Sequence, residues 1–138
     1  MNTISRLLLV ACLILPAIGW SQIPAMDIEM ELCESVVARR PLNPKKVFDP
    51  GDKAHCWLKV KNNYKGDYIL VEWYQQDTLR HTQHLHLPIE DMQTHCYKTV
   101  NEGGKWRAEV KDRKGNLLKE MAFTVRKEKL QFFNDNDF

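Results

Sequence analysis

Turn-forming residues recur about every ten residues along most of the chain, and this spacing constrains the fold more than any other feature. Short segments rich in β-branched and aromatic residues lie between the turns. The turns fall at residues 41–44, 49–52, 62–67, 88–91, 101–104 and 112–116. No segment keeps the three-to-four-residue apolar period of a long amphipathic helix. The pattern therefore predicts an all-β sandwich or barrel.

Alternation of apolar and polar side chains locates the strands within this pattern. Trp106, Ala108 and Val110 alternate with charged residues, and a second alternating segment follows the turn at 112–116, which predicts a β-hairpin. The expected strands lie near residues 31–38, 54–61, 67–74, 79–87, 93–100, 104–111 and 117–125. We therefore predict an immunoglobulin-like antiparallel β-sandwich of about seven strands at residues 32–126, after a leader at 22–31 and before a polar tail at 127–138.

The N-terminus has the pattern of a secretory signal peptide at residues 1–21. One positive charge precedes an apolar segment at 7–18, and the small residues Gly19 and Ser21 precede the expected cleavage site. The apolar segment is shorter than the roughly 20 residues that span a bilayer. We expect an exported protein, periplasmic or extracellular. A retained anchor helix and a lipid-modified Cys12 are the alternatives.

Composition excludes several classes of function. The 20 Lys+Arg and 18 Asp+Glu residues leave a net charge of +2, which gives no electrostatic reason to expect nucleic acid as a partner. A hydrophobic content of 43% is too high for a disordered chain. The sequence contains no phosphate-binding loop, nucleophile elbow or Cys-x-x-Cys motif, so no enzymatic activity is expected. The basic stretch that includes Lys59 and Lys61 is interpreted as a solvated face.

Three cysteines remain once Cys12 leaves with the predicted signal peptide: Cys33, Cys56 and Cys96. Export to an oxidising compartment favours one disulfide and one free thiol. Cys33 and Cys56 lie in consecutive expected strands, and their parity points both into the core, which predicts a Cys33–Cys56 disulfide. Spacing alone leaves two alternatives, three buried thiols or pairing through Cys96.

Four histidines cluster at His81, His84, His86 and His95. His84 and His86 face the same side of a strand. If the segments 79–87 and 93–100 pair with residue 87 opposite residue 94, His95 lies opposite His86 and three imidazoles converge. Zn or Cu suits such nitrogen ligands, so a metal site at His84, His86 and His95 is one hypothesis. The alternative is a polar outer strand.

Several short pieces of the chain, in this order and spacing, resemble the bacterial domain of unknown function 2914. The pieces are Cys33, 47–48 (VF), 51–52 (GD), 54–57 (AHCW), 71–74 (VEWY), 85–87 (LHL), 94–98 (THCYK) and 104–110 (GKWRAEV), followed by Asp112, Gly115, Leu118, Phe123 and Val125. The resemblance runs from about Leu32 to Val125 and also implies Cys33 and Cys56 as the paired cysteines. Glu72 stands where the family tends to have His, and Cys96 where it has Ser. The activity of the family is uncharacterised.

Aromatic and polar residues on the expected outer faces form a candidate binding face. Its members are Trp57, Glu72, Tyr74, His84, His86, His95 and Tyr97. Such side chains suit sugar stacking or protein contact, although Trp57 and Tyr74 can equally pack under a covering loop. The sequence thus predicts a non-catalytic binding module of the cell envelope, without a cofactor, for a glycan or protein partner. A periplasmic Zn- or Cu-binding protein is the alternative.

Overall fold

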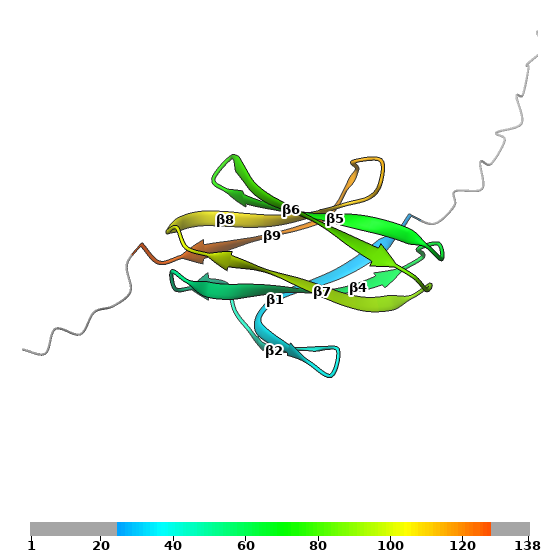
Figure 1. Cartoon of the computed structure of the whole chain (residues 1–138), viewed down its shortest axis with the longest axis horizontal. Coiled ribbons are helices and arrows are strands. Elements are labelled where there is room, and N and C mark those ends of the chain that lie inside the picture. Colours follow the sequence, from blue (N-terminus) through cyan, green and yellow to red (C-terminus); the bar gives the residue numbers. More distant parts are fainter. Residues whose placement is uncertain (1–24, 128–138) are drawn as a thin grey trace, which may run out of the picture.

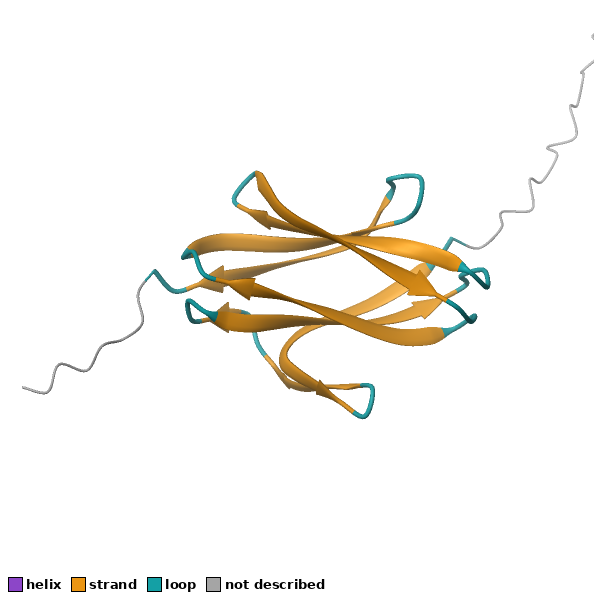
Figure 2. Ribbon diagram, in the orientation of Figure 1, coloured by secondary structure: helices purple, strands orange, loops and turns teal. Residues whose placement is uncertain are grey.

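Two β-sheets face each other in the computed structural model, which describes residues 25–127 (Figures 1 and 2). The strands are β1 (Asp27–Val37), β2 (Arg40–Pro44), β3 (Val47–Phe48), β4 (Asp52–Lys61), β5 (Asp67–Gln75), β6 (Thr78–Leu87), β7 (Met92–Val100), β8 (Gly104–Lys111) and β9 (Leu117–Val125). Sheet A has the order β2-β1-β4-β7, and sheet B has the order β3-β9-β8-β5-β6. The described residues contain no helix, and therefore none long and apolar enough to cross a membrane.

The strand order confirms the predicted immunoglobulin-like sandwich. Neighbouring strands are antiparallel except that β3 pairs in parallel with β9. The chain passes from sheet A to sheet B between β4 and β5 and returns between β6 and β7. All seven expected strands are present. The two additional strands are short, and β2 contains Pro41 and Pro44, which hid it from a search for alternating residues.

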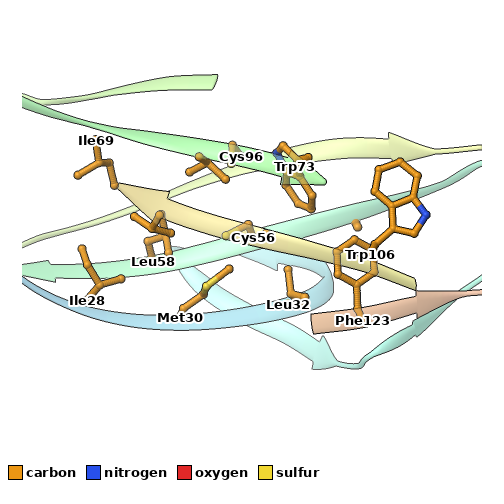
Figure 3. Close-up of a cluster of buried hydrophobic side chains, with 14 of the residues drawn as sticks. Ile28, Met30, Leu32, Cys56, Leu58, Ile69, Trp73, Cys96, Trp106 and Phe123 are labelled. Atoms are coloured by element: carbon orange, nitrogen blue, oxygen red, sulfur yellow. The ribbon is translucent and has the colours of Figure 1, made fainter. Parts of the chain in front are cut away.

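Alternate residues of the strands other than β2 point into the space between the sheets and form the core (Figure 3). The rings of Trp73, Phe48 and Trp106 surround Phe123 with centroid separations of 5.5–6.0 Å. The indole nitrogen of Trp73 donates a hydrogen bond to Gln83 Oε1 at 2.9 Å, so its burial leaves no unpaired donor. Burying side chains of this size contributes about 1.5–3 kcal/mol each.

The domain begins earlier than the sequence predicted. β1 starts at Asp27, and Ile28 and Met30 are buried in the core. Residues 27–31 therefore belong to the sandwich and not to a leader. The predicted signal peptide at 1–21, Cys12 and residues 128–138 of the predicted tail lie outside the described residues.

The first two strands form a hairpin that bends away from sheet A and then back over it. β1 pairs with β4 from Asp27 to Cys33, and its last residues pair only with β2. Ala38 and Arg39 make the turn with φ values of 50° and 62°, in the left-handed region. The carbonyl oxygen of Arg39 accepts a hydrogen bond from the indole nitrogen of Trp57 on β4 at 2.8 Å. The turn therefore covers part of the outer face of sheet A.

Candidate binding surface on the outer face of sheet A

The predicted binding face is divided between the two outer faces of the sandwich. Glu72 and Tyr74 on β5 and His84 and His86 on β6 lie in sheet B, and all have the parity opposite to the core residues. The other three, Trp57, His95 and Tyr97, lie on β4 and β7 in sheet A. Alternation predicted the outward orientation of these residues correctly. The assumption of one common face was wrong, because alternation does not show which sheet a strand joins.

The strand pairing assumed for the metal site is also wrong. β6 pairs with β5 and places His86 opposite Tyr68, whereas β7 pairs with β4 and places His95 opposite Trp57. His84 and His86 therefore lie on the outer face of sheet B, and His95 lies on the outer face of sheet A. Within residues 25–127 no three His, Cys, Asp or Glu side chains are placed to share a metal ion.

The structure does not contain the predicted Cys33–Cys56 disulfide; all three cysteines at 25–127 are free thiols. Leu32, not Cys33, is the register partner of Cys56. Cys33 is opposite His55 and shares the outward parity of that residue. It is nevertheless fully buried, because the β1–β2 hairpin covers it. The prediction that Cys33 points into the core was wrong, because Ile28, Met30 and Leu32 are the inward residues of β1 and Cys33 has the other parity.

On the outer face of sheet B, the charged groups of β5 and β8 bind one another. Lys111 Nζ lies 2.8 Å from Glu72 Oε1, and the Tyr74 hydroxyl donates to Glu72 Oε2 at 2.8 Å. The Arg107 guanidinium lies 4.2 Å from the centre of the Tyr74 ring and 3.7 Å from Glu109 Oε1. We call these five residues the sheet B network.

The sheet B network shifts the pKa of three of its members. The hydrogen bond from Lys111 lowers the pKa of the Glu72 carboxyl group below its ordinary value. The same contact raises the pKa of Lys111, and the hydrogen bond to Glu72 raises that of Tyr74. Each shift favours the protonation state present at neutral pH. The network therefore satisfies its own charges and leaves little for a ligand to neutralise.

Trp57, on the other outer face, supports the covering turn. Its side chain is only 7% exposed and donates to the Arg39 carbonyl oxygen. The alternative of packing under a covering segment is therefore the correct interpretation of Trp57. A ligand cannot stack on this ring while the turn is in place.

Beside the covering turn lies a hollow of about 480 Å³, which we call the basic hollow. Its cationic lining comes from three side chains: Arg39 of the turn and Lys59 and Lys61 of β4. Ile89 and Asp91, from the β6–β7 loop, line the opposite side together with Gln93 of β7. The hollow is therefore formed jointly by the β1–β2 turn, the end of β4, the β6–β7 loop and the start of β7.

None of the three cations of the basic hollow forms an ion pair within 4 Å among residues 25–127. Acidic residues are nearby all the same, since Asp91 lines the hollow and Asp27 is the register partner of Lys61. Glu29 is the register partner of Lys59, yet the two side chains do not make such a pair. The Asp91 carboxylate accepts the backbone N–H of Asn62 at 3.1 Å and so helps to hold its own loop. Interpreting Lys59 and Lys61 as a solvated stretch overlooked Arg39, which the hairpin brings to them from elsewhere in the sequence.

A cluster of rings lies on the same outer face, toward the other end of β4. The His55 and Tyr97 rings are 5.3 Å apart, and Lys53 Nζ lies 5.0 Å from the centre of the Tyr97 ring. Tyr97 is 46% exposed. Burial, together with the nearby His95 and Lys53, lowers the pKa of His55 below its ordinary value. His55 was not among the predicted site residues, although its parity with Trp57 was visible in the sequence.

Residues 66–125 match the family described as "Protein of unknown function (DUF2914)". The predicted family resemblance is confirmed over these residues, and the match does not extend to the predicted pieces between Cys33 and Trp57. The matched segment comprises β5 to β9 and includes the sheet B network. Arg39, Lys59 and Lys61 of the basic hollow lie outside it. No curated protein matches the sequence significantly.

Comparison with solved structures gives matches at low sequence identity. A β-glucosidase from Listeria innocua in complex with glucose is 14% identical with a TM-score of 0.52; the match covers 76% of this chain and 16% of that chain. A CARDB domain from Pyrococcus furiosus in complex with metal ions is 19% identical with a TM-score of 0.43, over 76% of this chain and 89% of that one. The chain thus spans about a sixth of the length of the β-glucosidase. The likeness to the β-glucosidase concerns the fold alone.

Proposed function

We propose that this protein is a non-catalytic binding module of the cell envelope that holds an acidic glycan in the basic hollow. The observation that carries the proposal is a set of three cations, Arg39, Lys59 and Lys61, around a concavity of about 480 Å³. None of them forms an ion pair within 4 Å in the part of the chain that the structure describes. Placement in the envelope follows from the predicted signal peptide. The absence of a catalytic motif in the sequence supports a binding role.

The lining of the hollow suits a sugar that carries a carboxylate. The Arg39 guanidinium has the planar fork that binds a carboxylate through two hydrogen bonds, and the lysines add point charges. The Gln93 amide can donate to and accept from sugar hydroxyls. Ile89, which is 56% exposed, offers an apolar surface to the C–H face of a pyranose ring. We favour a glycan over a protein partner because a concavity of this size fits one or two sugar rings.

Binding of a galacturonic acid oligomer, measured by calorimetry against the neutral galactose oligomer, tests the proposal. We expect saturable binding of the acidic oligomer alone. Replacing Arg39, Lys59 and Lys61 together by Gln should weaken binding at least 10-fold, since each charged hydrogen bond contributes about 1.5–3 kcal/mol. The matched control replaces Lys65, Lys114 and Lys119, three exposed lysines outside the hollow, by Gln. Absence of binding, or equal loss in the control, would overturn the proposal.

The metal-binding alternative makes a different prediction, which the same protein can test. It requires a one-to-one rise in Tm with Zn²⁺ or Cu²⁺ that is lost in His86→Ala. The division of His84, His86 and His95 between opposite faces argues against this result.

A further inference from the structure

Two thiols face each other inside the core. Cys56 on β4 and Cys96 on β7 are directly opposed in the antiparallel register, and their exposed fractions are 0% and 8%. Figure 3 shows both residues among the labelled core side chains. Cys33 lies apart from them, with its Sγ 3.7 Å from the carbonyl oxygen of His55.

We propose that Cys56 and Cys96 form a disulfide that joins β4 to the edge strand β7. The inference does not depend on the ligand of the basic hollow. It replaces the predicted Cys33–Cys56 pairing and leaves Cys33 as the free thiol.

Register makes Cys56 and Cys96 suitable for a disulfide bond. Directly opposed residues of an antiparallel pair have Cα atoms about 4.5–5.5 Å apart, within the 4.4–6.8 Å that a disulfide requires. Their side chains also lie on the same face of the sheet. The proximity of Cys96, together with burial, also raises the pKa of the Cys56 thiol, in agreement with the opposed register. Cys33 meets neither condition, since it is offset by one residue and has the opposite parity.

The oxidant we invoke is a low-molecular-weight disulfide such as oxidised glutathione. The Cys96 thiolate attacks one glutathione sulfur, which forms a mixed disulfide and releases one glutathione thiolate. Cys56 then loses its proton and attacks the Cys96 sulfur, and the second glutathione thiolate leaves. Two protein thiols lose two electrons, glutathione disulfide gains them, and the two protons pass to the released thiolates. Cys96 reacts first because it lies on an edge strand and is the more exposed of the pair.

The bond would strengthen the attachment of an edge strand. Within sheet A, β7 pairs only with β4. A Cys56–Cys96 disulfide closes a loop of about 40 residues, which includes the whole excursion through β5 and β6 into sheet B. It therefore restricts the unfolded chain and fixes the edge strand β7 to its neighbour β4.

Peptide mapping of the full chain, refolded in a glutathione redox buffer, tests the pairing. Trypsin separates the three sites, because Cys33 falls on the peptide 7–39 with Cys12, Cys56 on 54–59 and Cys96 on 81–98. After alkylation without reduction, we expect 54–59 linked to 81–98 and an alkylated Cys33. A link between 54–59 and 7–39, or alkylation of both Cys56 and Cys96, would overturn the proposal.

Two single variants make the test independent of refolding yield. Cys33→Ser should keep the linked peptide, and its Tm should fall on the order of 10 °C when reductant is added. Cys96→Ser should lack the link and show no Tm change with reductant. If Cys96→Ser fails to fold, the peptide map of Cys33→Ser still decides the pairing. Equal sensitivity of both variants to reductant would contradict the assignment.

Discussion

The two outer faces of the sandwich carry similar residues but differ in how many of their charged side chains form ion pairs. On sheet B, Glu72, Lys111 and Arg107 are neutralised by neighbours at 2.8–3.9 Å. On sheet A, Arg39, Lys59 and Lys61 surround a hollow without such partners among residues 25–127. A face that neutralises its own charges mainly supports the sheet beneath it. The proposed binding of an acidic glycan rests on this difference.

Among substitutions that test the difference between the two faces, Trp57→Ala on sheet A should have the largest effect on stability. Loss of the buried indole and of its hydrogen bond to Arg39 should lower the free energy of unfolding by about 3 kcal/mol, as measured in urea. Removing this support should also release Arg39 from the basic hollow and weaken glycan binding. Tyr74→Ala on sheet B is the matched control and should leave binding unchanged. Unchanged stability of Trp57→Ala would show that the turn does not rest on this ring.

A smaller effect is expected from Glu72→Gln in the sheet B network. The variant removes the ion pair with Lys111 and should cost about 1 kcal/mol at pH 7, because these groups are partly exposed. Folding lowers the pKa of Glu72, so its contribution is complete above the unfolded value near pH 4.3 and disappears as the pH falls through the folded value. Urea unfolding at pH 7 and pH 3 should show a larger difference between wild type and variant at pH 7 than at pH 3.

The smallest effect on stability is expected from His55→Gln on sheet A. It should appear at a higher pH than the effect of Glu72→Gln. Folding lowers the pKa of His55, so the unfolded chain binds its proton more readily. Stability due to this residue is complete above the unfolded value near 6.5 and is lost as the pH falls toward the folded value. Between pH 7 and pH 5 the free energy of unfolding should fall less in the variant than in the wild type. The difference should be smaller than about 1 kcal/mol. If stability depended on pH in the same way in the variant and the wild type, the surroundings of His55 would not favour its neutral form.

Because His55 and Glu72 affect stability in different pH ranges, one pH series can measure the contributions of the two faces separately. Stability measured from pH 8 to pH 3 should respond first to His55 on sheet A and then to Glu72 on sheet B. A double variant should show both changes additively, because the residues lie on opposite faces with no shared contact. Coupling between them would contradict the independence of the two faces.

Much of the fold was predictable because alternation is a local property of a strand. Ile69, Val71 and Trp73 were expected on one face of their strand and are fully buried. The same holds for Cys56, Leu58 and Val60. β2 and β3 were missed because a proline-containing strand and a two-residue strand are too short to show a period.

The candidate site was predicted less well, because it depends on contacts between distant segments. Outward orientation was correct for His84, His86 and His95, but their assignment to one hairpin was not. Lys59 and Lys61 appeared in the sequence as ordinary solvated residues. Only the folded β1–β2 hairpin brings Arg39 close to them, so that the three cations line one hollow.

The sequence by itself determined the seven longer strands, most of the residues that they bury and the family resemblance of residues 66–125. Those properties depend on neighbours along the chain and on a period of two residues. The tertiary structure decided which sheet each strand joins, how the histidines are divided and which cysteines meet. Those outcomes depend on burying both inner faces at once, which places β6 and β7 in different sheets although they follow each other in the chain.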